Sequence, residues 1–179
     1  MKQSVKKVWN IVSTVLVVLV VLLAVALVGV RLVGIRTYAV VSGSMEPTYP
    51  TGSLLYVKSA DASELQVGDA ITFMVDEDTV ATHRIIEILP DEEDSSVLRF
   101  RTQGDANDTP DGTPVHYKNI IGKPVFSVPY LGYVAHFVQN PPGLYLTIGA
   151  AAILVVLVFL PDLFKEEKKQ DAPKDGANP

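Results

Sequence analysis

The chain has 179 residues, enough for one domain of ordinary size, and 48% of them are hydrophobic while 20% are charged. Its formal net charge of −5 argues against a nucleic-acid partner. The absence of cysteine excludes a disulfide framework and a thiolate metal site, and it leaves the redox compartment undetermined.

The first predicted element is a membrane anchor. An apolar segment runs from Val8 to Val30 without a charge, and three lysines precede it. Because about 20 such residues cross a bilayer as a helix, we predict a transmembrane helix over residues 8–32 after a cytoplasmic N-terminus at 1–7. A cleaved signal peptide has an apolar core of only about 7–15 residues and a small-residue cleavage site. Neither feature is present, so an uncleaved anchor is favoured.

Residues 37–140 show the pattern of a β domain. Short segments rich in β-branched and aromatic residues alternate with turn signals that contain Gly, Pro and Asp. No 3.6-residue periodicity of useful length interrupts them. We therefore predict a mainly β, mostly antiparallel extracytoplasmic domain, with strands at 54–57, 70–75, 84–89, 97–101 and 120–126.

A second apolar segment, from about Leu144 to Leu160, follows a Pro-Pro-Gly break, and lysines come after it. It predicts another transmembrane helix over 143–161, followed by a disordered cytoplasmic tail at 162–179. Lysines at the two outer ends place both termini in the cytoplasm and make the chain a multi-pass protein of the cell membrane. Arg31 and Arg36 run against this tendency, because they lie on the outer flank of the first helix.

A possible nucleophile lies just beyond the first helix, in the sequence Ser42-Gly43-Ser44-Met45-Glu46-Pro47. Gly43 can bend the backbone and expose Ser44, but a serine hydroxyl stays a weak nucleophile until a base accepts its proton. His83, next to a predicted strand, is a suitable base. An acidic residue must orient the imidazole, and both Asp105 and Asp111 are candidates on one loop, with Asp105 slightly favoured.

Other candidates for the base are weaker. His116 and His136 are rivals, and Lys58 is a remote alternative that would give a Ser-Lys site. Three scattered histidines offer no metal-ligand spacing, so we expect no metal and no cofactor.

Taken in order, four motifs resemble the successive motifs of type I signal peptidases. They are the serine motif 42–47, Val67-Gly68-Asp69, His83-Arg84-Ile85, and Gly104-Asp105-Ala106-Asn107 with Asp111. Many bacterial members have a lysine base, whereas a histidine at this place resembles the endoplasmic-reticulum type, which archaea and some Gram-positive bacteria share. Alanine stands at position 106, where the eukaryotic pattern usually has asparagine.

This resemblance implies roles for the residues that match. Ser44 would be the nucleophile, His83 the general base, and Asp105 or Asp111 the orienting acid. Ser42 would be a tentative second oxyanion donor, and an ordinary turn serine is an equal alternative. Arg84 is expected to pair with a carboxylate.

The implied activity is that of a membrane-bound serine endopeptidase that removes signal peptides from exported preproteins with small residues before the cleaved bond. The lipid bilayer and secretion machinery would be its other partners. The alternative is a catalytically silent, membrane-anchored β domain that serves as a binding or scaffold subunit of a secretion complex.

Overall fold

The computed structural model describes residues 2–91, 94–95 and 97–170. They belong to two units, Val20–His136 on the one hand and Met1–Leu19 with Phe137–Pro179 on the other. The elements in chain order are α1 (Lys2–Leu27), η1 (Gly29–Val33), β1 (Ile35–Ala39), β2 (Leu54–Lys58), η2 (Ala62–Glu64), β3 (Ala70–Met74), β4 (Val80–Pro90), β5 (Leu98–Gln103), β6 (Val115–His116), η3 (Tyr117–Asn119), β7 (Ile120–Val128), α2 (Leu131–Gln139) and α3 (Gly143–Gln170).

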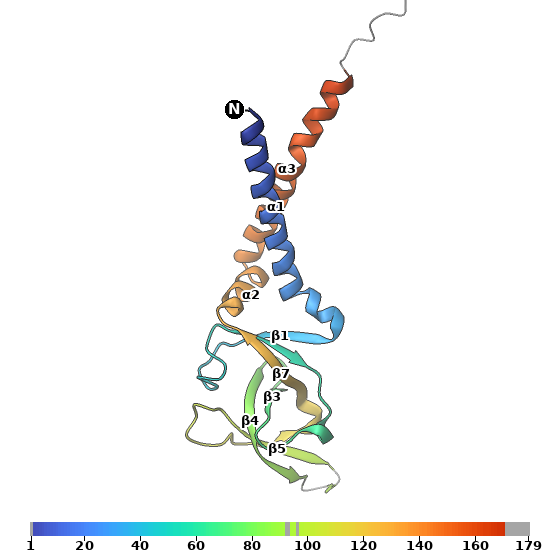
Figure 1. Ribbon diagram of the computed structural model, residues 1–179. Helices are drawn as coiled ribbons and strands as arrows, with labels where there is room; N and C mark the ends of the chain where they lie inside the picture. The colour runs from blue at the N-terminus through green and yellow to red at the C-terminus, as the bar shows by residue number, and fades with distance from the viewer. Residues whose placement is uncertain (1, 92–93, 96, 171–179) are drawn as a thin grey trace, which may run out of the picture. The chain divides into compact units, whose positions relative to one another are not determined.

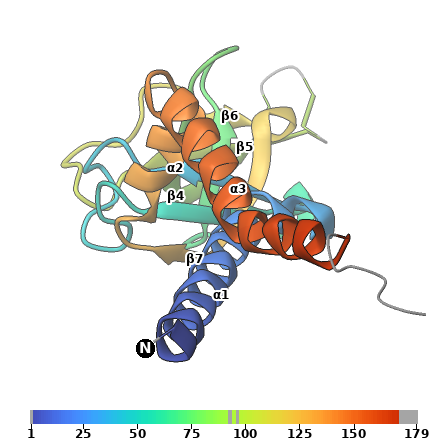
Figure 2. The ribbon, with the colours of Figure 1, turned by 90° about the horizontal axis from the view of Figure 1, so that it is seen from above.

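The unit Val20–His136 is mainly β, as predicted. Its seven strands form one sheet in the order β1-β2-β7-β3-β4-β5-β6, and every neighbouring pair is antiparallel. Register shifts interrupt three of these pairings, and such bulges bend strands and increase their twist. The sheet is accordingly curled rather than flat, as Figures 1 and 2 show from two directions.

The hydrophobic core lies inside the curl of β3, β4 and β5. Ile71 and Phe100 are completely shielded from solvent, and Ile85 is nearly so. On β4 and β5 the residues next to Ile85 and Phe100 are more exposed, which is the pattern of a sheet with one packed side, whereas on β3 the three consecutive residues Ile71–Phe73 are all buried. The remaining members of this core cluster are Leu65, Phe73 and Val115.

Strand β2 differs, because four consecutive residues, Leu54–Val57, are buried. Tyr56 stacks on Phe126 of β7 with ring centroids 4.2 Å apart. Its hydroxyl also donates a hydrogen bond to the carbonyl of Ala26 in the last turn of α1, at 2.9 Å. The end of α1 is thereby attached to the sheet within this unit.

Five of the seven strands lie where the sequence predicts strands, but β1, β6 and α2 were not predicted. Strand β1 directly follows the apolar segment and contains Arg36, so the sequence reads as the flank of an anchor. Its Ile, Thr and Tyr residues are nevertheless good strand formers. Strand β6 is only two residues long and leaves almost no pattern.

One described helix is long and apolar enough to cross a membrane. This is α1 over Lys7–Leu27, where mean hydropathy reaches 2.9 and only 6% of the most apolar window is buried. The α-helix ends at Leu27, earlier than the predicted limit at 32, and the chain continues as the tighter turn η1. Gly29 lies at this change, and glycine is among the poorest helix formers.

The second apolar segment forms α3. It meets the same criterion only together with α2, as a bent pair broken between residues 139 and 143. Helix α3 continues past the predicted end at 161 to Gln170, where a disordered tail was expected from 162 onward. The Lys and Glu residues that follow Pro161 are good helix formers, which explains the extension. The rest of the predicted tail, 171–179, lies outside the described residues.

Candidate active site

Ser44 lies in a tight turn between β1 and β2. The Glu46 N–H donates to the Gly43 carbonyl at 3.0 Å, and the Tyr49 N–H donates to the Met45 carbonyl at 2.9 Å. The Met45 side chain is buried, with 2% of its surface exposed. Because Met45 is fixed in the interior, its neighbour Ser44 is held at the surface of the turn and its hydroxyl remains partly accessible.

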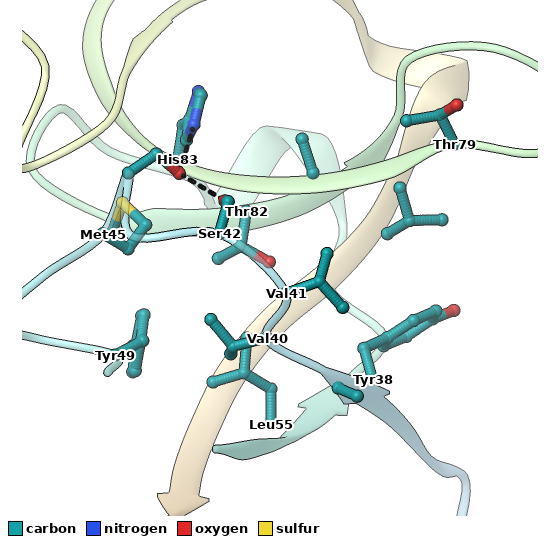
Figure 3. Close-up of a pocket in the computed structure, with 14 residues that line it drawn as sticks. Tyr38, Val40, Val41, Ser42, Met45, Tyr49, Leu55, Thr79, Thr82 and His83 are labelled. Carbon is teal, nitrogen blue, oxygen red and sulfur yellow. Dashed lines mark hydrogen bonds between the residues drawn. The ribbon is translucent and has the colours of Figure 1, made fainter. Parts of the chain in front are cut away.

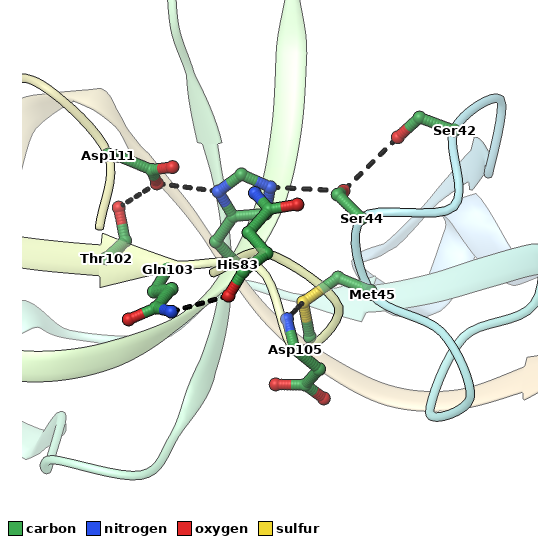
Figure 4. Close-up of polar contacts among 9 residues, drawn as sticks. Ser42, Ser44, Met45, His83, Thr102, Gln103, Asp105 and Asp111 are labelled. Carbon is green, nitrogen blue, oxygen red and sulfur yellow. Dashed lines mark hydrogen bonds and ion pairs between the residues drawn. The ribbon is translucent and has the colours of Figure 1, made fainter. Parts of the chain in front are cut away.

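His83 comes from the middle of the sheet. It lies on β4 opposite Ile71 of β3, and its side chain is 14% exposed. Its Nε2 atom is 3.1 Å from Ser44 Oγ, and a dashed line marks this contact in Figure 4. The ring of Phe73 packs against the imidazole edge to face, with centroids 6.2 Å apart. A strand position with packed neighbours limits the rotamers that this imidazole can adopt.

Asp111 contacts the other ring nitrogen. Its Oδ2 atom is 2.6 Å from His83 Nδ1 and also accepts a hydrogen bond of 2.6 Å from Thr102 Oγ1. The Asp111 N–H donates to the Thr102 carbonyl at 2.8 Å. A carboxylate only accepts hydrogen bonds, so in a neutral imidazole Nδ1 carries the proton. Nε2 is then free to accept the proton of Ser44.

Asp105, the slightly favoured orienting acid, contacts a different partner. Arg84 donates to it from Nε at 2.8 Å and from Nη2 at 2.7 Å, and Thr48 Oγ1 donates to it at 2.6 Å. The hydrogen bonds from Arg84, followed by that from Thr48, lower the pKa of Asp105 below its ordinary value despite partial burial. The expectation that Arg84 pairs with a carboxylate is therefore confirmed, and Asp111 takes the place beside His83.

The loop that contains Asp105 is attached directly to the serine turn. The Ala106 N–H donates to the Ser44 carbonyl at 2.9 Å, and the Asp105 N–H points at Met45 Sδ, 3.4 Å away. A Cβ atom on Gly104 would lie 2.5 Å from that same Ser44 carbonyl oxygen. Only glycine permits this approach, so Gly104 sets the spacing between the serine turn and the loop that leads to Asp111.

The network yields a stability prediction for Asp105→Asn. A lowered folded-state pKa means that the Arg84–Asp105 pair stabilises the fold at neutral pH, and that this contribution is lost as the pH falls through the folded pKa of Asp105. The variant should be less stable than the wild type at pH 7 by roughly 1 kcal/mol, since Arg84 is 35% exposed. Thermal unfolding in detergent measures the difference, which should shrink below about pH 4. An unchanged difference at acidic pH would contradict this origin.

Sequence reasoning missed Thr102, whose side chain is completely buried. A polar residue at an inward position of β5, in line with Phe100, was the available signal. Its hydroxyl is a hydrogen-bond donor to the carboxylate oxygen that also contacts His83. We infer that Thr102 positions Asp111.

Thr102→Val should therefore lower kcat by about tenfold without changing KM, because the isosteric side chain keeps the packing but removes the donor. Thr102→Ser keeps the hydroxyl and should restore most of the activity. Initial rates of peptide cleavage measure both variants. Equal rates for Thr102→Val and the wild type would show that the hydroxyl does not position Asp111.

Ser44 and His83 both line a cavity of about 330 Å³. Figure 3 shows Val40 and Val41 on one side of it and Thr79 and Thr82 on the other. Strand β4 pairs with β5 only from Arg84 onward, so residues 80–83 are paired on the β3 side alone among the described strands. The cavity thus runs along a free strand edge.

The remaining candidates lie elsewhere or have lesser contacts. The Ser42 hydroxyl is 3.2 Å from that of Ser44. His116 lies on β6, where its Nδ1 accepts from the Lys118 N–H, and His136 lies on α2. Lys58 ends β2 in register with Ile35. Among the described residues, no group of three His, Cys, Asp or Glu side chains is arranged to hold a metal ion.

A serine hydroxyl, an imidazole and a carboxylate linked in this order form the arrangement by which serine hydrolases activate a hydroxyl. The sequence matches the family described as signal peptidase, peptidase S26, over residues 11–124. The chain belongs to this family.

The chain is also similar to individual signal peptidases. Signal peptidase I W of Bacillus subtilis is 48% identical over 83 residues, which cover 46% of this chain and 42% of the relative. The signal peptidase complex catalytic subunit SEC11C of Homo sapiens is 28% identical over 127 residues, 64% of this chain and 65% of the relative. The SEC11 subunit of Fusarium vanettenii is 32% identical over 129 residues, 66% of this chain and 73% of the relative. The match with either of the first two spans less than two thirds of the relative's length.

Proposed function

We propose that this chain is a membrane-bound serine endopeptidase that removes signal peptides from exported preproteins. The observation that supports it best is the linked set of contacts from Ser44 to His83 and from His83 to Asp111, at 3.1 and 2.6 Å. A silent scaffold subunit has no need of these contacts beside an open cavity. Membership of the signal peptidase family supports the substrate class.

In the proposed reaction, Ser44 Oγ attacks the carbonyl carbon of the cleaved bond while its proton passes to His83 Nε2. Asp111 stabilises the imidazolium that forms. The imidazolium then gives its proton to the leaving amine, and the acyl group stays on Ser44. Water, activated by the same imidazole, hydrolyses this ester and restores the serine.

The negative charge that develops on the substrate oxygen needs hydrogen-bond donors. The Ser44 N–H is one candidate, and the Ser42 hydroxyl, 3.2 Å from Ser44 Oγ, is the second. Rotation of the Ser42 hydroxyl towards the substrate would free Ser44 Oγ for attack.

The substrate would bind as an extended strand along the free edge of residues 80–83, as peptides add to exposed sheet edges. Successive side chains would then point alternately into and away from the cavity. Val40, Val41 and Leu55 line this cavity. Its apolar lining and limited volume suit small side chains at the first and third positions before the cleaved bond.

The test uses full-length protein in detergent micelles and a preprotein with alanine at both positions. We expect one product whose new N-terminus follows the alanine, and roughly hundredfold slower cleavage when phenylalanine replaces the alanine next to the bond. Intact-mass measurement identifies the product. Equal rates for the two preproteins, or an uncleaved alanine preprotein, would contradict the proposal.

We also propose that α1 and the apolar part of α3 both span the cell membrane, with the β domain outside and both ends of the chain in the cytoplasm. The apolar length of α1, the combined length of the α2–α3 pair and the terminal lysines support this orientation. Because the chain has no cysteine, Ser4→Cys and Ser95→Cys introduce unique labels. An impermeant maleimide should label position 95 on intact cells and position 4 only after permeabilisation, and the reverse pattern would refute the orientation.

The curated names of the SEC11 relatives describe them as catalytic subunits of a signal peptidase complex. By this analogy we propose that the present chain also works beside secretion machinery. Copurification of the full-length protein with a stable companion from native membranes would support this.

A further inference from the structure

A second cavity lies at the opposite end of β1 from the serine turn and plays no part in the proposed reaction. It has a volume of about 540 Å³, within the range of roughly 300–1,000 Å³ typical of small-ligand sites. Arg31 and Arg36 line it, together with the hydroxyl-bearing residues Thr37, Tyr38 and Ser59. None of its lining residues is acidic.

The local backbone brings the two arginines to one cavity. Arg31 belongs to η1 and Arg36 to β1, and Gly34 joins the two elements with a φ of 77°, a left-handed conformation that glycine adopts without strain. The Gly34 N–H donates to the Arg31 carbonyl at 3.1 Å, which closes the turn. Arg31 and Arg36 therefore line the same cavity.

The charge in this cavity is not balanced by the protein. Within the part of the chain that the structure describes, neither Arg31 nor Arg36 forms a hydrogen bond or an ion pair through its side chain, whereas Arg84, Arg99 and Arg101 each pair with a carboxylate. The positive charge of Arg31 interacts favourably with the carbonyl end of the helical turn η1. Arg36 lies on strand β1, where no helix dipole stabilises its charge. Two unpaired guanidinium groups with nearby hydroxyls are suited to a phosphate, which accepts bidentate hydrogen bonds from arginine.

The surroundings indicate where the phosphate comes from. The cavity directly follows the apolar helix α1, whose last turn is attached to β2 through Tyr56 and Ala26 at 2.9 Å. Between the two arginines, Leu32 is 91% exposed and Val33 is 72% exposed. Aliphatic side chains so exposed beside basic ones are typical of segments that lie in the headgroup region of a bilayer.

We propose that this cavity binds the phosphate of an anionic phospholipid headgroup at the membrane surface where α1 ends. Arg31 and Arg36 bind the phosphate. Leu32 and Val33, which lie between them in the sequence, contact the acyl chains. This site also accounts for the presence of two arginines on the flank of the helix that positive residues usually avoid. The proposal is independent of the peptidase chemistry.

The test measures lipid binding to full-length protein purified in detergent. Short-chain phosphatidylglycerol, short-chain phosphatidylcholine and inorganic phosphate are titrated separately, and the rise in unfolding temperature gives an apparent Kd. Wild-type protein should bind phosphatidylglycerol more tightly than either of the other two. Arg31→Gln/Arg36→Gln should raise the Kd for phosphatidylglycerol by about tenfold or more.

A matched variant, Arg101→Gln/Lys118→Gln, removes the same charge from β5 and η3 and should bind as the wild type does. Comparable loss in this control would show that general charge attraction is responsible and would overturn the site. Equal Kd values for inorganic phosphate and phosphatidylglycerol would show that the site binds a free anion, and the lipid proposal would then be wrong. If the double variant does not fold, Arg36→Lys serves instead, and an unchanged Kd there and in Arg36→Gln would also refute the proposal.

Discussion

Ser44→Ala is expected to abolish preprotein cleavage, lowering the rate by about three orders of magnitude or more. The change removes one oxygen, which contacts only His83 Nε2 and Ser42 Oγ among the described residues. The backbone contact that joins the serine turn to Ala106 remains, as does the buried side chain of Met45. The fold and membrane insertion should therefore be unchanged.

Cleavage of the alanine preprotein by purified variants, at equal protein concentration, measures this effect. Ser63→Ala, on η2, is the matched control and should be as active as the wild type. Ser42→Ala should be intermediate, about a hundredfold slower, if its hydroxyl is an oxyanion donor. A Ser44→Ala protein that keeps a large fraction of wild-type activity would contradict the assignment of Ser44 as the nucleophile.

His83→Ala should be as damaging as the serine substitution, and the double variant Ser44→Ala/His83→Ala should be no worse than either single one. Residues that act as one unit show such non-additive losses, because neither can work without the other. His116→Ala is the matched control and should have little effect, since that imidazole accepts a hydrogen bond only from the neighbouring Lys118 N–H among the described residues.

The two aspartates should differ in the same assay. Asp111→Asn places an amide beside His83 Nδ1 and disturbs the tautomer, so kcat should fall by about three orders of magnitude. Asp105→Asn leaves the His83–Asp111 contact in place and should cost far less activity, with its main effect on stability. Equal losses in the two variants, or the reverse order, would contradict the assignment of Asp111 as the residue that orients His83.

The choice between these aspartates shows where sequence reasoning ends. Both lie on one turn-rich loop after β5, and nothing in their residue types distinguishes them. Which of the two aspartates contacts His83 depends on the path of this loop in the folded protein. Arg84, the neighbour of His83, points its guanidinium at Asp105, while the backbone of Asp111 returns to Thr102. Arg84 is 21 residues from Asp105 and Thr102 is 9 residues from Asp111, and no local pattern encodes either contact.

The serine turn and the histidine could be named as candidates from the sequence, because glycine and proline around Ser44 and the strand pattern after His83 are local signals. Strand positions were predicted for the same reason, since alternation and β-branched residues mark each strand separately. The order of strands was not predictable. It depends on the pairing of β7 with both β2 and β3, which register shifts allow and which sequence patterns do not reveal.

This placement of β7 has a consequence for synthesis of the protein. Strands β1 and β2 flank the serine turn, and β3, β4 and β5 bring the histidine and the aspartate, but in the sheet the two groups meet only through β7. Until Ile120–Val128 has left the ribosome, the nascent chain has no strand to join them. If the proposed peptidase activity is correct, the newly made chain should stay inert until its translation is nearly complete, and a chain truncated before residue 120 should contain every proposed reactive group and yet cleave nothing.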